Sequence, residues 1–315
     1  MRGLHLTSGK LSFRADLPPP RTRQGWTRVE VLRAGICATD LALKRGYMDF
    51  AGVPGHEFVG VALDGPLAGR RVVGGINAAC GDCATCRAGR PRHCPNRTVL
   101  GILGRGGAFA EELVLPAANL LPVPDAVGTD AATFAEPLAA AFEIVEQTDL
   151  GEVGRALVVG DGRLGLLCAQ VLALHVPRVD VAGRHPERAA RLAADLRWVA
   201  DPAAEERYDL VVEATGAPEV LAAALGFVRP RGTVVLKTTA ERPATLDLAP
   251  LVVDEITLVG SRCGPFEPAL EALAAGRVQV EPLVEARYPL EQGAEAFERA
   301  GRRGVLKVLV DVGDS

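Results

Sequence analysis

The feature that most constrains the fold is a glycine motif between two apolar runs. Gly160, Gly162 and Gly165 fit the pattern G-x-G-x-x-G. A short β-branched run ends at the first glycine, and Leu164–Leu174, which is long enough for a helix, follows the motif. In dinucleotide-binding proteins the first glycine makes the turn, the second admits the pyrophosphate, and the third lets the helix pack against the strand. The alternative, a purely structural strand–helix turn, is the weaker hypothesis because both flanking elements are present. The expected nucleotide contacts are Gly160, Gly162, Arg163, Leu164 and Gly165.

Strands and helices alternate through the rest of this region. The expected strands are Ala156–Gly160, Arg178–Ala182, Leu210–Ala214, Thr233–Lys237 and Ile256–Gly260. The expected helices are Asp130–Gln147, Leu164–Leu174, Pro186–Leu196 and Pro218–Phe227. This alternation predicts an α/β fold of the Rossmann type, with a doubly wound parallel sheet covered by helices on both faces.

The first part of the chain has a different pattern. Up to about Pro124, short alternating runs are separated by glycine and proline, which indicates a β-rich domain. The C-terminal segment carries two short helical patterns and a last apolar strand, Val305–Val310, that could return to the first domain. We therefore expect a β-rich domain at residues 1–125, joined by residues 265–315, and a nucleotide-binding domain at residues 126–264.

Composition and charge exclude several classes of protein. The 315 residues are 48% hydrophobic and 23% charged, which is too apolar for a disordered chain. A formal net charge of −4 gives no reason to expect nucleic acid or an anionic membrane as a partner. The N-terminus lacks the apolar core of a signal peptide, and no apolar run is long enough to span a bilayer. We therefore expect a cytoplasmic protein.

Four of the seven cysteines form the strongest metal signal. Cys80, Cys83, Cys86 and Cys94 have spacings of two, two and seven residues, and four thiolates can complete a tetrahedral shell around Zn²⁺. Such a shell leaves no open position, so the predicted zinc is structural and stabilises its segment. Unrelated thiols, two disulfides and an iron–sulfur cluster are the alternatives, and we favour zinc because the spacing is compact and the expected compartment is reducing.

Three further short motifs contain residues that could bind a metal. They are Cys37-x-Thr39-Asp40, Gly55-His56-Glu57 and Ala135-Glu136-Pro137. Taken singly they are weak signals, because a lone cysteine is usually a small buried apolar residue. Their joint presence with the cysteine cluster and the glycine motif carries the argument.

These motifs, in this order, are similar to those of a known family. The chain resembles the zinc-containing alcohol dehydrogenases of the medium-chain dehydrogenase/reductase superfamily. The shared motifs are C-x-T-D, G-H-E-x-x-G, the four cysteines, A-E-P-L-A, G-x-G-x-x-G and E-A-T-G, the last at Glu213–Gly216. The resemblance covers nearly the whole chain. It implies a GroES-like β-rich catalytic domain, a Rossmann cofactor domain with the active site between the two, and a homodimer or homotetramer.

The resemblance also implies a second, catalytic zinc. Cys37 and His56 would be ligands, and Glu136 would be the third, where some relatives carry cysteine or aspartate. Glu57 would lie beside the metal, as a transient ligand or a neighbour of the ligands. Asp40 would accept a hydrogen bond from the free ring nitrogen of His56 and fix its tautomer. Two zinc ions per chain are therefore expected.

Three protein ligands leave one zinc position open for water or for the substrate oxygen. The hydroxyl of Thr39 would stand next to that oxygen, take the alcohol proton and pass it toward solvent. A hydride would then move from the substrate carbon to the nicotinamide. The alternative role for Thr39 is to cap the helix that follows Cys37.

The residues after the second strand of the Rossmann domain select NAD or NADP. In NAD-specific relatives an acidic residue there binds the ribose 2′-OH. Gly183 occupies that position here, Asp180 comes too early, and Arg184, His185 and Arg188 follow. Glycine leaves room for a 2′-phosphate and arginine suits it as a donor, so we favour NADP over NAD. The alternative is a solvated Arg184 and an enzyme that accepts both.

Two more residues are implied as cofactor contacts. Thr215 belongs to the E-A-T-G segment. Lys307 aligns with a basic residue that contacts the pyrophosphate in relatives, although a single lysine on a strand is usually only solvated. Ile256–Gly260 is a candidate edge strand for pairing across a two-fold axis.

The predicted function is hydride transfer between a small-molecule alcohol, or its aldehyde or ketone, and NAD(P). One alternative is a sugar or polyol dehydrogenase of the same family. The other is a non-catalytic nucleotide-binding scaffold, which would be expected to have lost metal ligands that this chain keeps.

Overall fold

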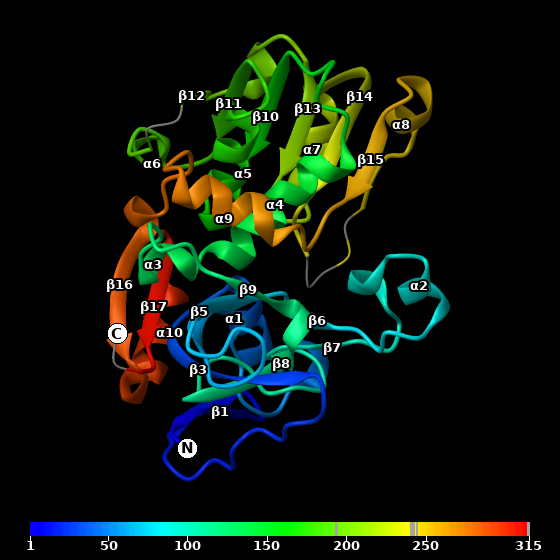
Figure 1. The fold of residues 1–315 in the computed structure, drawn as a ribbon. Coiled ribbons are helices and arrows are strands. Elements are labelled where there is room, and N and C mark those ends of the chain that lie inside the picture. The colour runs from blue at the N-terminus through cyan, green and yellow to red at the C-terminus, as the bar shows by residue number, and fades with distance from the viewer. Residues whose placement is uncertain (193–194, 240–242, 244, 314–315) are drawn as a thin grey trace. The chain divides into compact units, whose positions relative to one another are not determined.

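A computed structural model describes residues 1–192, 195–239, 243 and 245–313 of the chain (Figure 1). The chain divides into two compact units. The first unit is Met1–Glu136 with Leu283–Ser315, and the second is Pro137–Pro282. The domain boundaries expected from the sequence, at residues 125 and 265, stay predictions.

The second unit contains a parallel sheet of six strands in the order β12-β11-β10-β13-β14-β15. The strands are β10 (Arg155–Val159), β11 (Arg178–Ala182), β12 (Leu196–Trp198), β13 (Tyr208–Glu213), β14 (Val228–Leu236) and β15 (Thr257–Gly260). The central strands β10 and β13 are almost continuously buried, as is usual where helices cover both faces of a parallel sheet. The helices of this unit are α4 (Ala135–Gln147), which begins in the first unit, α5 (Arg163–Ala173), α6 (Pro186–Ala189), α7 (Val220–Phe227), α8 (Ala249–Val253) and α9 (Phe266–Ala274).

The first unit is built on a mainly antiparallel sheet in the order β16-β17-β3-β4-β5-β9, and β8 also pairs with β3. The strands are β3 (Trp26–Gly35), β4 (Glu57–Ala62), β5 (Arg71–Gly74), β8 (Glu112–Pro116), β9 (Leu120–Pro122), β16 (Val284–Pro289) and β17 (Lys307–Asp311). The pairs β1 (Gly3–Thr7) with β2 (Lys10–Arg14), and β6 (Asn77–Ala78) with β7 (Thr98–Val99), are separate. The helices are α1 (Ala38–Lys44), α2 (Ala84–Arg87), α3 (Thr129–Ala132) and α10 (Gly293–Ala300), and η1 (Tyr47–Asp49) is one of the short 3₁₀ turns.

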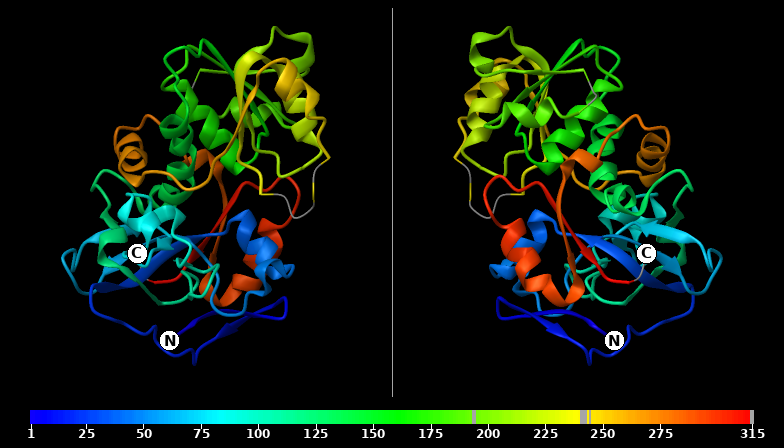
Figure 2. Two further views of the ribbon diagram at one scale, coloured as in Figure 1. Left: turned by 90° about the vertical axis from the view of Figure 1, so that its right-hand side faces the viewer. Right: turned by 90° about the vertical axis from the view of Figure 1, so that its left-hand side faces the viewer.

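The C-terminal strand joins the first unit. β17 lies between β16 and β3, so the red end of the chain runs beside a blue N-terminal strand (Figure 1 and Figure 2). The predicted α/β class, with one β-rich unit and one unit built on a parallel sheet, is confirmed.

The expected helix Asp130–Gln147 is two helices. α3 ends at Ala132, and the next residues make tight i→i−3 turns, with the Thr133 hydroxyl donating to the Asp130 carbonyl at 2.7 Å. Pro137 lacks an N–H donor and fits only the first turn of a helix, which is where α4 places it. The helix Pro186–Leu196 was also predicted too long. It ends at Ala189 as α6, and Leu196 instead starts β12, which pairs with β11. Among the described residues, no helix combines the length and apolar character that crossing a bilayer requires.

Candidate metal and cofactor sites

The four cysteines of the first motif lie together. The Sγ atoms of Cys83 and Cys86 are 3.5 Å apart, those of Cys83 and Cys94 are 3.8 Å apart, and those of Cys94 and Cys80 are 3.5 Å apart. Four sulfurs bound to one zinc at ~2.3 Å would stand about 3.8 Å from each other. The four cysteines of this cluster form no disulfide bond. The donor set and its spacing fit a structural zinc.

Local backbone geometry supports this cluster. Gly81 has φ +86°, a conformation that turns the chain between the first two cysteines and that other residues rarely adopt. The N–H of Cys80 donates to the sulfur of Cys94 at 3.5 Å. The backbone N–H of Cys86 lowers the pKa of the Cys83 thiol to about 6. Burial raises the pKa of the neighbouring Cys86 thiol to about 12. Of these two residues, Cys83 is therefore the one favoured as a thiolate, which is the form that binds metal.

The second group consists of Cys37, His56 and Glu57. Cys37 follows β3 by two residues and His56 immediately precedes β4, and these two strands pair with Gly35 opposite Glu57. One ligand atom from each of the three side chains lies within 4.8 Å of the other two. His56 and Glu57 are 3% and 1% exposed, and Cys37 is half-buried. Sulfur, nitrogen and oxygen donors at this spacing fit a catalytic zinc.

Asp40 forms hydrogen bonds with both segments that carry the candidate metal ligands. It is fully buried, and its Oδ2 accepts the N–H of Cys37 at 2.8 Å while its Oδ1 accepts the N–H of Gly55 at 3.1 Å. Oδ1 also lies 3.4 Å from Nδ1 of His56, which makes no hydrogen bond of good geometry within the described residues. The expected hydrogen bond between His56 and Asp40 therefore stays a prediction.

The electrostatics of this group favour a cation. Burial by itself lowers the pKa of His56, but the carboxylate of Asp40 and the sulfur of Cys37 outweigh it and hold that pKa well above its usual value. Negative charge around a buried imidazole is the environment that a bound metal ion would neutralise.

Glu57 forms a buried ion pair with Lys307. The ammonium is in close contact with Oε2 of Glu57 and lies 5.4 Å from the ring centroid of Phe134. Lys307 is only 2% exposed, so it is not the solvated lysine that is usual on a strand. Gly35 leaves room for this pair, because a Cβ at that residue would lie 2.5 Å from the Glu57 carboxylate. The predicted contact of Lys307 with the pyrophosphate stays a prediction, while its partner in the structure is Glu57.

Glu136 and Thr39 were also predicted for this site. Glu136 is the second residue of α4, is half-buried, and lies outside the group formed by Cys37, His56 and Glu57. The hydroxyl of Thr39 lies 3.9 Å from the sulfur of Cys37. The N-cap residue of α1 is Cys37, so Thr39 does not cap this helix.

The glycine motif forms a tight turn between β10 and α5. Gly160 has φ +122°, and a Cβ there would lie 2.7 Å from the carbonyl oxygen of Ala214. A Cβ at Gly165 would lie 1.9 Å from the carbonyl oxygen of Gly160. At Gly162, the N-cap of α5, a Cβ would meet nothing within 4 Å. The first and third glycines thus serve packing, and the second leaves open space at the helix N-terminus, as a dinucleotide needs.

A carboxylate that was not predicted lies at the end of β11. Asp161, the second residue of the glycine motif, is buried and accepts the N–H groups of Arg184 at 2.9 Å and His185 at 2.5 Å. Arg188 donates to its carbonyl oxygen at 3.1 Å. A Cβ at Gly183 would lie 2.5 Å from Cγ of Asp161, so the space that the glycine leaves is filled. The only sequence signal was an acid inside the glycine motif.

Thr215 helps to fix the turn after β13. Its N–H and hydroxyl donate to Oε1 of Glu213 at 2.8 Å and 2.5 Å, and Glu213 is 1% exposed. The N–H of Gly216 donates to Thr238 at 2.9 Å. This turn packs on Gly160, so Thr215 lies in the neighbourhood of the glycine motif.

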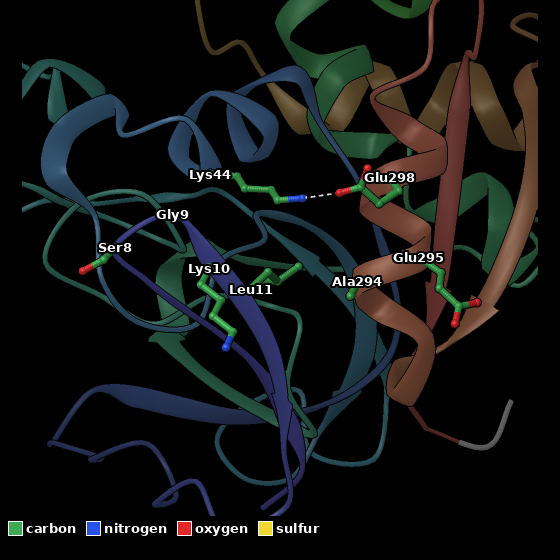
Figure 3. A pocket seen from close by; sticks show the side chains of 8 residues that line it. All are labelled: Ser8, Gly9, Lys10, Leu11, Lys44, Ala294, Glu295 and Glu298. Carbon is green, nitrogen blue, oxygen red and sulfur yellow. Dashed lines mark hydrogen bonds and ion pairs between the residues drawn. The ribbon is translucent and has the colours of Figure 1, made fainter.

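A surface hollow of about 500 Å³ lies elsewhere in the first unit (Figure 3). Lys44 at the end of α1 and Glu298 on α10 point toward each other across it, with a nitrogen–oxygen distance of 2.5 Å. Its lining, within the described residues, includes none of the predicted metal or nucleotide residues: Ser8, Gly9, Lys10, Leu11, Lys44, Ala294, Glu295 and Glu298.

The fold and these sites are those of a nucleotide-dependent enzyme with two groups of side chains that could bind metal ions. Comparison with known families gives the same class. Residues 23–125 match the model of the alcohol dehydrogenase GroES-like domain, and residues 139–312 match that of the glucose dehydrogenase C-terminus.

Individual relatives agree over nearly the full length. The chain is 32% identical to L-threonine 3-dehydrogenase of Streptomyces coelicolor, over 94% of this chain and 95% of the relative. The structure of the alcohol dehydrogenase RspB from Escherichia coli CFT073, complexed with NADH, superposes with a TM-score of 0.88 at 28% identity and 99% coverage of both chains. A structure described as a zinc-binding dehydrogenase, from Sinorhizobium meliloti 1021 and bound to NADP, gives 0.88 at 25% identity and 98% coverage of both.

The chain belongs to the zinc-containing alcohol dehydrogenase family of the medium-chain dehydrogenases/reductases. It is an oxidoreductase that transfers a hydride between an alcohol, or the corresponding aldehyde or ketone, and NAD(P).

Proposed function

We propose that the enzyme oxidises a small polar alcohol at a catalytic zinc held by Cys37, His56 and Glu136, with Glu57 as a transient ligand. The observation that carries this proposal is the group formed by Cys37, His56 and Glu57, whose ligand atoms lie within 4.8 Å of one another. A second zinc, bound by the four clustered cysteines, would be structural.

When bound, zinc supplies a Lewis acid for the substrate oxygen, and the nicotinamide accepts or returns the hydride. The protein's own side chains transfer the proton and orient the zinc ligand. Thr39 accepts the proton of the substrate hydroxyl while its own hydroxyl proton passes toward solvent, and its position 3.9 Å from the Cys37 sulfur supports this role. Asp40 orients His56, since it already holds the backbone on both sides of the site.

The relatives support a proposal for the class of alcohol. The names of three relatives give L-threonine, D-arabinitol and L-galactonate as their substrates. These molecules share a secondary hydroxyl next to another polar group. A polyol, hydroxy acid or amino alcohol is therefore the substrate class we propose, in preference to a simple apolar alcohol.

NADP(H) is the cofactor that we propose from the end of β11. Arg184 is exposed and can pair with a 2′-phosphate, and Gly183 carries no competing acid of its own. Arg188 adds a second positive charge to the same segment. The related structures with NADP and with NADH are consistent with either cofactor in this family.

A homodimer or homotetramer is proposed from the edge strand β15. Leu258 on that strand is 36% exposed, and Val252 and Val253 on the preceding helix are 77% and 78% exposed. A second copy pairing along this edge would cover both the open backbone groups and this apolar surface. A cytoplasmic location stays part of the proposal.

The test combines metal content with turnover. The purified protein is analysed for zinc and assayed by absorbance with NADPH and NADH against alcohols, polyols, hydroxy acids and their carbonyl forms. We expect two zinc ions per chain and turnover of at least one polar secondary alcohol. If the protein binds two zinc ions but turns over none of these compounds, the proposed substrate class is contradicted. If it binds one zinc ion, and that ion is lost when the cysteine cluster is mutated, the proposed catalytic zinc site is contradicted.

A further inference from the structure

The cofactor-selecting end of β11 receives its acidic group from a different segment. Gly183 has no side chain, yet a Cβ built there would lie 2.5 Å from Cγ and 2.8 Å from Oδ1 of Asp161. The carboxylate of Asp161 therefore occupies the volume where a side chain at residue 183 would begin. Asp161 belongs to the glycine motif, 22 positions earlier in the chain.

This carboxylate is held in place at one oxygen. Both backbone donors, the N–H groups of Arg184 and His185, bind Oδ2. The other oxygen, Oδ1, lies 3.8 Å from the guanidinium of Arg188. Asp161 is 6% exposed, so its orientation is set by these contacts and not by solvent. Oδ1 retains accepting capacity next to residue 183.

We propose that Asp161 takes the place of the missing acid at the end of β11, where it weakens the preference for NADP(H) that Arg184 confers. Its Oδ1 accepts the ribose 2′-OH of NAD(H), and its charge disfavours the 2′-phosphate of NADP(H). The inference rests on the proposed function, because it requires a nicotinamide dinucleotide at the glycine motif.

Asp161 and Arg184 then act in opposite directions. A carboxylate accepts hydrogen bonds from a ribose diol and repels a phosphate, whereas a guanidinium attracts the phosphate. Cofactor choice is therefore a balance between these two residues. Removing the charge of Asp161 shifts the enzyme toward NADPH, and removing the side chain of Arg184 shifts it toward NADH.

The test measures binding directly, so it depends neither on zinc nor on turnover. Dissociation constants for NADH and NADPH are obtained from nicotinamide fluorescence for the wild type, Asp161→Asn and Arg184→Ala. The ratio Kd(NADH)/Kd(NADPH) is expected to rise about tenfold in Asp161→Asn and to fall about tenfold in Arg184→Ala. Asp149→Asn is the matched control, because Asp149 accepts a backbone N–H two residues on, before β10, and its change should leave the ratio unaltered.

A variant that moves the acid from residue 161 to residue 183 distinguishes recognition of the ribose from support of the loop after β11. Asp161→Gly should raise the ratio as Asp161→Asn does, and adding Gly183→Asp should return it to within threefold of the wild type. A ratio that stays constant in Asp161→Asn and Asp161→Gly, or that the exchange does not restore, overturns the inference. Equal weakening of both cofactors would mean that Asp161 only supports the loop. Failure of the wild type to bind either dinucleotide would overturn the proposed function as well.

Discussion

Glu57 and Lys307, 250 positions apart in the sequence, form an ion pair that is buried on both sides. Glu57 starts β4 and Lys307 starts β17, and β3 lies between these strands in the sheet. The C-terminal segment thus contributes a side chain to the surroundings of the candidate catalytic zinc.

Removing one partner of this pair should cost more stability than removing both. Lys307→Met leaves the Glu57 carboxylate buried and unpaired, which costs about 3–5 kcal/mol in comparable cases. Adding Glu57→Gln should recover a large part of that loss. Urea unfolding of zinc-depleted protein measures this. Lys44→Met, which removes the exposed pair with Glu298, is the control and should cost less than about 1 kcal/mol. Equal losses for Lys307→Met and Lys44→Met would contradict the prediction.

Two glycines of the nucleotide motif should respond differently to the same substitution. Gly165→Ala places a Cβ 1.9 Å from a backbone oxygen, so it should lower stability by about 1–3 kcal/mol or more. Gly162→Ala meets nothing within 4 Å, so the fold should be retained while the affinity for NADH and NADPH falls at least about tenfold. Thermal melting and dinucleotide titration of both variants check this. Loss of stability in Gly162→Ala would be the contrary result.

Asp180 should support the second unit in a pH-dependent way. It is fully buried on β11 and accepts hydrogen bonds from Arg197, Arg155 and Tyr208 at 2.8–3.0 Å. Burial alone would raise the pKa of Asp180, but these donors outweigh it and hold the pKa well below its usual range. The ionised form is therefore favoured in the folded chain. Its contribution is complete above the unfolded pKa of about 3.9 and is lost as pH falls toward the lower folded value.

The variant Asp180→Asn tests this linkage. At pH 7 it should lower the free energy of unfolding by about 3–5 kcal/mol, because three donors lose their charged acceptor. The difference from the wild type should shrink below about pH 4, where the wild type begins to lose the same contribution. Urea unfolding at several pH values provides the measurement. A difference that does not change with pH would show that packing, not charge, accounts for the loss.

The two metal groups should be separable by mutation. Cys83→Ala should remove one zinc per chain and lower the melting temperature, because metal binding to the four cysteines is coupled to folding. Cys37→Ala should remove the other zinc and abolish turnover with little change in melting temperature. Zinc analysis and calorimetry on both variants distinguish these outcomes. Retention of both zinc ions in either variant would contradict the assignment.

Local sequence signals predicted part of the fold well. The strand Arg178–Ala182 has the bounds expected from its apolar pattern, and the glycines lie between strand and helix as the motif requires. The long helix across residues 130–147 was predicted incorrectly, because its apolar spacing continues through a break that Thr133 and Pro137 cause. Spacing reports which face of a segment is apolar, and it does not report where backbone hydrogen bonding stops.

The candidate sites show the same division. The four cysteines come together within one short segment, so their spacing was sufficient to predict them. Cys37 and His56 could be paired only through a family resemblance, since their proximity depends on the pairing of β3 with β4. Asp161 was missed because its importance depends on residue 183 having no side chain, and no local pattern connects the two residues.

The sequence by itself determined the chemical groups that are available and the structure of short segments, because both depend on neighbours a few residues apart. It therefore specified the cysteine cluster, the glycine turn and the alternation of strands and helices. Only the tertiary structure decided which charged groups meet: Lys307 with Glu57, and Asp161 with the end of β11. Strand pairing brings together residues that are far apart in the sequence. A buried charge is costly without a partner, so the stability of each of these charged groups depends on the residue that strand pairing places beside it.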